Sequence, residues 1–147
     1  MNKTTTLIVI LVLILSIACI ALQKEPEIQT LNEILPVNPI NCIEDPVVFI
    51  SQEESKYVTL PQRECNDLFY ALNNLTYTLK NKVSSLDNYG CIRFFADGKN
   101  MEILFSDTRD GSILINDVDT DGKEPVYAVS CGKDALKELF LESIPSE

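Results

Sequence analysis

The stretch from Cys91 to Cys131 constrains the fold more than any other part of the sequence. Three Asp-Gly dipeptides, Asp97-Gly98, Asp110-Gly111 and Asp121-Gly122, divide it into four short apolar runs. Asp-Gly between β-rich runs is a strong hairpin signal, because glycine accepts the positive φ that tight hairpin turns require. The pattern therefore predicts a four-stranded antiparallel meander. Its strands are expected at 91–96, 101–105, 112–116 and 126–131.

Both faces of this predicted meander carry apolar side chains. One face is expected to contain Ile92, Phe94, Ile103, Phe105, Ile113 and Ile115. The other face is expected to contain Phe95, Leu104, Leu114, Tyr127 and Val129. A single helix does not cover both faces of a sheet. The second face is therefore expected either to receive a C-terminal helix or to dock a partner.

The sequence around the meander predicts a hairpin and two helices. Residues 46–50 and 56–60 are β-rich runs on either side of a polar stretch, which indicates a hairpin with a longer loop. Pro61 suits the start of a helix, where its missing N–H removes no hydrogen bond. Apolar side chains then recur at three- and four-residue steps, which predicts one long amphipathic helix. They are Cys65, Leu68, Phe69, Leu72, Leu75 and Leu79.

The predicted fold class is α+β, with a single extracytoplasmic domain over residues 46–147. The hairpin and the meander form its antiparallel sheet, and the long helix packs on that sheet. A short C-terminal helix is expected at about 133–143, where Leu136, Leu139 and Phe140 make an apolar side. A hydrophobic membrane helix or signal precedes this domain.

Residues 1–22 are predicted to be a signal peptide or a membrane-anchor helix. Lys3 precedes an uncharged apolar run from Leu7 to Leu22. That pattern fits a signal-anchor helix or a cleaved signal peptide. Residues 15–19, Leu-Ser-Ile-Ala-Cys, resemble the lipobox of bacterial lipoproteins, and the resemblance implies lipidation of Cys19. Each alternative delivers the rest of the chain to the extracytoplasmic side, anchored to the cell membrane or secreted.

Residues 23–45 are predicted to be a spacer that contains Pro26, Pro36 and Pro39. Proline breaks helices and removes backbone donors, which favours a semi-extended stem between membrane and domain. A helical spacing of apolar residues before Pro36 leaves a short helix as an alternative, and such a helix could dock a partner. The apolar residues are Ile28, Leu31 and Leu35.

Charge and the absence of histidine exclude several classes of function. The formal net charge is −10, and all 22 acidic residues follow Leu22. A field of that sign repels nucleic acid, so no nucleic-acid partner is expected. The chain contains no histidine, which excludes Ser-His-Asp and Cys-His catalytic sites and zinc sites built on imidazole. An enzyme is therefore not expected.

Cys42, Cys65, Cys91 and Cys131 lie beyond the apolar run, and no two of them have the CxxC spacing. An even number of cysteines in an oxidising compartment favours two disulfides, with three possible pairings. Cys42–Cys65 is geometrically simple, because the predicted hairpin brings its two ends together. Cys91–Cys131 is harder. These residues begin and end the meander, further apart than the ~7 Å limit unless the sheet reorders or curls.

Residues 117–122, Asp-Val-Asp-Thr-Asp-Gly, resemble the first half of an EF-hand calcium loop. Alternate carboxylates of Asp117, Asp119 and Asp121 could converge on one hard cation. Ala128 stands where the twelfth-position Glu of an EF-hand would be, so a true EF-hand is excluded. A calcium loop of another type and a solvated acidic turn remain the two alternatives.

The function expected from the sequence is a small membrane-tethered or secreted module with a binding or accessory role and no catalytic activity. Its partners are expected to be the membrane, through the N-terminal segment, and an unidentified protein. The alternative is a calcium-dependent binding or stability module that uses the Asp117–Asp121 loop. No cofactor other than calcium is expected.

Overall fold

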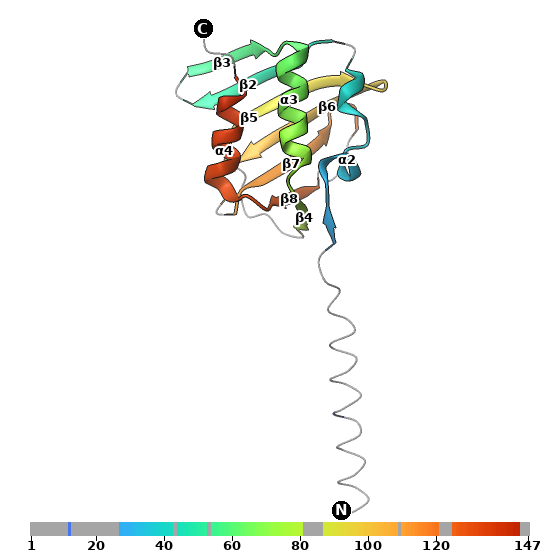
Figure 1. The fold of residues 1–147 in the computed structure, drawn as a ribbon, viewed down its shortest axis with the longest axis vertical. Coiled ribbons are helices and arrows are strands. Elements are labelled where there is room, and N and C mark those ends of the chain that lie inside the picture. The colour runs from blue at the N-terminus through green and yellow to red at the C-terminus, as the bar shows by residue number, and fades with distance from the viewer. Residues whose placement is uncertain are drawn as a thin grey trace, which may run out of the picture.

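The structure is a computed structural model, and it describes residues 12, 27–42, 44–52, 54–80, 87–108, 110–120 and 125–144. The described chain forms an α+β fold around one antiparallel sheet (Figure 1). Its strands are β1 (Ile28–Gln29), β2 (Val47–Gln52), β3 (Glu54–Thr59), β4 (Tyr77–Lys80), β5 (Asn88–Ala96), β6 (Lys99–Ser106), β7 (Ser112–Asp117) and β8 (Val126–Val129). Its helices are α2 (Leu31–Ile34), α3 (Gln62–Asn73) and α4 (Gly132–Glu142), with a 3₁₀ turn, η1, at Pro39–Asn41.

The predicted meander is confirmed. β5, β6, β7 and β8 pair antiparallel in sequence order. Asp97 and Gly98 have φ values of 50° and 80° and connect the paired residues Ala96 and Lys99. Two adjacent residues with positive φ are typical of the type I′ hairpin turn, which is the turn that Asp-Gly favours.

The predicted hairpin is also confirmed, but the sheet is larger than the sequence indicated. β2 and β3 pair with each other, and their strands extend through the polar stretch to the pair Gln52–Glu54. β2 also pairs with β5, which joins the hairpin to the meander. β1 and β4 add two further strands next to β8, so the described sheet has the order β1-β4-β8-β7-β6-β5-β2-β3.

The long helix was predicted wrongly in its second half. α3 ends at Asn73, and residues 77–80 form β4, which pairs with β8. The alternation Thr76-Tyr77-Thr78 favours a strand, because β-branched and aromatic side chains fit a pleated surface. Tyr77 is fully buried, and its hydroxyl donates a hydrogen bond of 2.6 Å to the carbonyl oxygen of Leu72. Leu75 and Leu79 therefore do not continue the helical stripe.

Much of the segment predicted as a spacer packs on the domain instead. α2 begins with a capping box in which the Thr30 backbone N–H donates to the carboxylate of Glu33 at 2.6 Å. Three apolar side chains of this segment belong to the core: Leu31, Leu35 and Val37. The backbone N–H of Asn38 donates to the carboxylate of Asp97 at 2.9 Å, which ties the segment to the first meander turn. These apolar side chains stabilise the fold by burial, which a solvated stem does not require.

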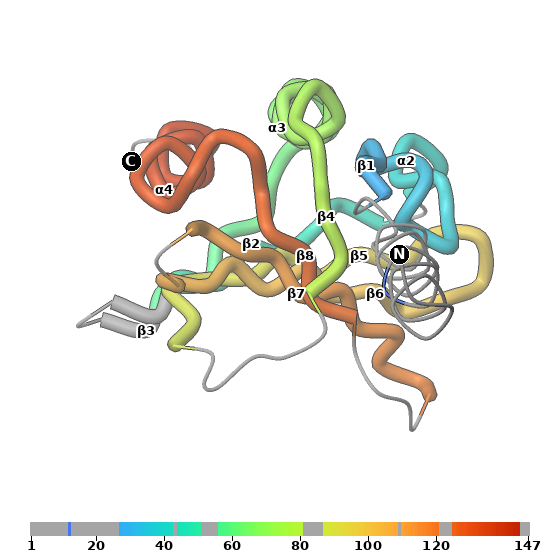
Figure 2. The backbone as a smooth tube through the Cα atoms, turned by 90° about the horizontal axis from the view of Figure 1, so that it is seen from below, coloured from blue at the N-terminus to red at the C-terminus, as the bar shows by residue number. Residues whose placement is uncertain are grey.

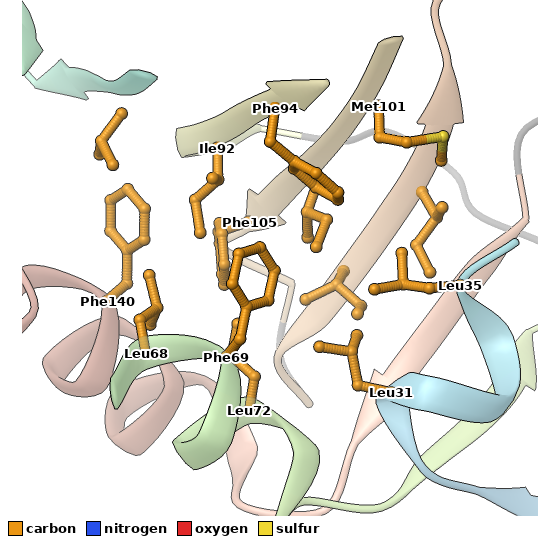
Figure 3. Close-up of a cluster of buried hydrophobic side chains, with 14 of the residues drawn as sticks. Leu31, Leu35, Leu68, Phe69, Leu72, Ile92, Phe94, Met101, Phe105 and Phe140 are labelled. Atoms are coloured by element: carbon orange, nitrogen blue, oxygen red, sulfur yellow. The ribbon is translucent and has the colours of Figure 1, made fainter. Parts of the chain in front are cut away.

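One hydrophobic core fills the space between the helices and one face of the sheet. Leu68, Phe69 and Leu72 of α3 point toward Ile92, Phe94 and Phe105 of the meander, and α2 closes one side of the cluster (Figure 3). The six side chains assigned from the sequence to the first sheet face are all buried in this core. Tyr127 and Val129 belong to the same core, although the sequence assigned them to the second face. Tyr127 pairs with Ile113, and directly paired residues share a face of the sheet.

α4 lies on the same face of the sheet as α3 (Figure 2). The alternative in which this helix covers the second face is therefore wrong. We call the face opposite α3 and α4 the open face. A row of directly paired side chains crosses it: Phe49, Cys91, Leu104, Leu114 and Val126.

The docking of α4 depends on the absence of a side chain at Gly90. A Cβ at this position would lie 2.5 Å from the ring of Phe140 and 2.8 Å from the carbonyl oxygen of Phe49. We expect Gly90→Ala to lower the free energy of unfolding by about 1–3 kcal/mol, because an overpacked core must shift its side chains and backbone. Urea unfolding followed by circular dichroism measures this effect.

Gly98 provides the matched control for that substitution. A Cβ at Gly98 would meet no atom within 4 Å, although its φ is +80°. Asn adopts this backbone conformation more readily than most residues, so Gly98→Asn is expected to cost less than about 1 kcal/mol. Equal losses in the two variants would contradict the packing argument.

The predicted membrane segment, residues 1–22, lies outside the described residues except for Val12. Among the helices that the structure describes, none is long and apolar enough to span a membrane.

Candidate functional site

A groove of about 490 Å³ lies between α3 and α4 on the outer side of the helix layer. The two helices lie side by side and run in opposite directions (Figure 1). Each helix lines the groove with residues at three- and four-residue steps, which places them on one side of that helix. α3 contributes Glu64, Asp67, Leu68 and Ala71, and α4 contributes Ala135, Glu138, Leu139, Glu142 and, just beyond its end, Ser143.

The rim of the groove is acidic. It consists of Glu64 and Asp67 on α3 and Glu138 and Glu142 on α4, and no Lys or Arg is among the described residues that line the groove. The ion pairs that the structure describes lie elsewhere: Lys80–Asp110, Arg93–Glu102, Lys99–Asp117 and Lys133–Asp107. Within the described chain the four rim carboxylates therefore have no cationic partner. Four uncompensated negative charges border one hollow.

The floor of the groove is apolar. Leu68 reaches down into the core and is 2% exposed, while Leu139 packs partly buried beside the core. The walls of the groove are low at one end, where Ala71 and Ala135 lie, because neither side chain extends beyond a methyl group. The volume falls within the range of roughly 300–1,000 Å³ that is usual for ligand sites. The site thus combines an apolar floor with a charged border.

Two of the rim acids occupy positions that weaken their own helix. Glu142 lies in the last turn of α4, which contains no basic residue. A negative charge there faces the negative end of the helix dipole. Glu138 and Glu142 are also four residues apart, a spacing at which like charges repel. Departures from local rules of this kind are expected at functional or strained sites.

The candidate calcium residues lie at the end of β7, and two of the three are described. Asp117 accepts a hydrogen bond from Lys99 Nζ at 3.2 Å, and Asp119 accepts one from Asn100 Nδ2 at 3.0 Å. Asp121 lies outside the described residues. Among the residues that are described, no three His, Cys, Asp or Glu side chains are grouped to hold a metal. The calcium site stays a prediction.

That prediction has a direct test. If the loop binds calcium, the ion at 100 times its Kd adds about 2.7 kcal/mol to the free energy of unfolding. Asp119→Asn should remove the gain by removing a hard oxygen charge from the loop. Thermal unfolding with and without millimolar calcium measures both effects. If calcium leaves the melting temperature of the unsubstituted chain unchanged, the calcium hypothesis is contradicted.

The structure brings one predicted cysteine pair together. The thiols of Cys42 and Cys65 contact each other, and burial raises the pKa of Cys65 to about 12, with the neighbouring Cys42 adding to the rise. Both are free thiols in the structure. Cys91 and Cys131 are not brought together, because β6 and β7 lie between β5 and β8. The predicted lipidation residue, Cys19, lies outside the described residues.

The open face is a weaker candidate for a binding surface. Three of its central side chains are already shielded by their neighbours, since Cys91 and Leu114 are each 5% exposed and Val126 is 7% exposed. Tyr57, which pairs with Phe49 toward the edge of this face, is 68% exposed. Arg93 and Glu102 also form an ion pair of 2.6 Å there. A partner would gain little newly buried apolar area at these positions.

No protein-family model, curated protein or solved structure matches the chain.

The groove was not found from the sequence. Its two sides are separated by more than sixty residues along the chain, and nothing in the sequence states that α3 and α4 are neighbours. A local signal does exist in α4. Glu142 closes a helix that has no basic residue in its last turn, and that departure from the usual charge pattern marks the position.

Proposed function

We propose that this chain is a non-catalytic binding module, tethered to the membrane or secreted, that works on the extracytoplasmic side and uses the α3–α4 groove as its binding site. The acidic rim of the groove is the main observation that supports the proposal. Its charges have no partner among the described residues, and those on α4 oppose the stability of their helix. A binding role accounts for such positions, whereas stability does not.

Two features of the sequence support the other parts of the proposal. The apolar run from Leu7 to Leu22 after Lys3 is typical of an export or anchor segment. The absence of histidine removes the commonest general base and the commonest nucleophile-activating group. Binding also requires no further residues beyond those that the groove already presents.

Crosslinking in the cells that produce the chain tests the groove. A photo-crosslinking amino acid at Ala135 lies in the groove, and one at Tyr70 lies on α3 but outside the groove lining, where that residue is 73% exposed. We expect a discrete protein adduct from position 135 and none of that size from position 70. The same adduct from both positions would argue against the groove as the site.

Location is tested separately by the mass of the mature N-terminus and by protease treatment of intact cells. An acylated Cys19, a cleaved signal or an intact anchor would each fit the proposal, provided that external protease reaches the domain. Recovery of the full chain from the cytosol, with Met1 attached and protected from protease, would contradict it.

A further inference from the structure

We infer that the α3–α4 groove binds a basic amphipathic helix of a partner protein, with the apolar stripe of that helix on the groove floor and its Lys or Arg side chains against the acidic rim. This inference rests on the proposed function and names the chemistry of the partner.

The charge of the groove indicates the charge of the segment that binds it. Glu64, Asp67, Glu138 and Glu142 border the groove, and the side chains that the structure describes along it include no Lys or Arg. A second copy of the chain would bring another formal net charge of −10 toward this surface, and like charges disfavour that encounter. A cationic segment satisfies the rim and relieves the repulsion between Glu138 and Glu142 at the same time.

The distribution of the charges favours an extended ligand over a metal ion. Among the described residues, which include the rim carboxylates, no three His, Cys, Asp or Glu side chains are grouped to hold a metal ion. Because α3 and α4 are antiparallel, Glu64 and Glu142 lie toward one end of the groove, while Ala71 and Ala135 lie toward the other (Figure 1). The negative charge is thus spread along both sides of the hollow. A ligand that carries several spaced cations matches this arrangement better than a single ion does.

Shape favours a helix as the form of the ligand. The lining of α3 from Glu64 to Ala71 covers roughly two helical turns, or about 10 Å at ~1.5 Å per residue. A third helix laid between two packed helices is a recurring recognition mode, read by apolar anchors at three- and four-residue steps. Leu139, which is only partly buried, provides an apolar contact for such anchors, and the alanines leave room for them.

The test uses the full chain in zwitterionic nanodiscs and three synthetic helical peptides. The first repeats leucine and lysine so that lysines flank one apolar stripe. The second replaces every lysine with glutamate, and the third scrambles the first so that the stripe is lost. Isothermal titration calorimetry measures binding, with empty nanodiscs as the blank. We expect the first peptide to bind with a Kd of roughly 10 µM, typical of small transient interfaces, and the others at least about tenfold more weakly.

Two groove variants and one control locate the binding. Ala135→Arg places a cation and a long side chain in the groove, and we expect at least a tenfold loss of affinity. Glu138→Gln with Glu142→Gln removes two rim charges, and we expect about a three- to tenfold loss, since each exposed ion pair contributes modestly. The control is Glu27→Gln with Glu44→Gln, which makes the same change in net charge outside the groove lining and should leave the affinity unchanged.

A stability readout separates function from structure in the same variants. Glu142→Gln removes an acid from the last turn of α4 and a like charge four residues from Glu138. We expect it to raise the melting temperature by about 2–4 °C while it weakens peptide binding. A variant that is more stable but binds less tightly cannot owe its lost affinity to misfolding.

The outcomes are distinct. Binding of the lysine peptide that the groove variants weaken and the control does not would support the inference. Equal binding of the glutamate peptide would overturn the partner chemistry, as would a dimer of the chain that Ala135→Arg dissociates. Binding that no groove variant changes would overturn the inference and the proposed site together. Absence of peptide binding alongside a specific crosslink from position 135 would overturn the inference alone.

Discussion

Replacing Phe140 with alanine is expected to lower the free energy of unfolding by about 3–5 kcal/mol, the largest effect of any substitution considered for this chain. Phe140 is fully buried, and its ring centroid lies 4.5 Å from that of Phe105 and 5.7 Å from that of Tyr89. Truncation loses the transfer free energy of the ring and leaves a cavity that the sheet cannot close, because Gly90 beneath it has no side chain to fill the space.

Urea unfolding measures the effect, and Leu141→Ala on the same helix is the control. Leu141 is 37% exposed, so its truncation should cost less than about 1.5 kcal/mol. Phe140→Ala should also weaken binding in the groove, because Phe140 holds α4 on the sheet and α4 forms one wall. Similar losses of stability in the two variants would contradict the position given to α4.

The second large effect concerns the thiols of Cys42 and Cys65. If the chain is exported as proposed and the two thiols are joined, the disulfide closes a loop that contains the β2–β3 hairpin and ties the N-terminal segment to α3. A closed loop of this size contributes about 3 kcal/mol, mainly by restricting the unfolded chain. Bond formation requires an oxidant, which we take to be a disulfide-bearing oxidoreductase of the export pathway. The two thiols are oxidised to the disulfide, and the oxidant's disulfide accepts the two electrons and two protons.

Unfolding with and without dithiothreitol tests this pair. We expect the reductant to lower the stability of the disulfide-bonded protein by about 3 kcal/mol and to leave the stability of Cys42→Ser unchanged. Thiol titration of the denatured, unreduced protein is the independent check. Free sulfhydryls at both Cys42 and Cys65 in protein taken from its own compartment would rule the bond out.

Alkaline pH provides a further distinction between the two redox states. Burial raises the pKa of Cys65 from its ordinary 9.0 to about 12 in the folded protein. In the reduced state the unfolded chain releases this proton first, so the thiol's contribution to stability is complete below pH 9 and is lost as the pH rises toward 12. A disulfide has no proton to lose there. The reduced protein should therefore lose more stability than the oxidised protein between these values.

The sheet was largely predictable from the sequence because its signals are local. Asp97-Gly98 specifies its own turn through two positive φ values, and the meander strands follow from the turns and from period-2 apolar runs. The sheet face on which Tyr127 lies was predicted wrongly, because it does not depend on a local signal. Its side is set by the register with Ile113, and register depends on a loop whose length the sequence does not fix.

The errors lie where tertiary contacts override local patterns. Leu75 and Leu79 keep a helical spacing, yet pairing with β8 and burial of Tyr77 favour a strand there. Leu31 and Val37 stand among prolines and polar residues that indicate a spacer, yet the core buries both. The groove belongs to the same class. Its walls meet only because α3 and α4 share one face of the sheet, and no short-range signal states that.

Methyl NMR spectra of the full chain, labelled at alanine and leucine and titrated with the lysine peptide, test the central claim most directly. Leu68, Ala71, Ala135 and Leu139 report on the groove, and Leu104 and Leu114 report on the open face. We expect saturable shifts at the four groove methyl positions and unchanged signals at the two open-face leucines. Shifts confined to Leu104 and Leu114 would show that the binding surface is the open face and contradict the account.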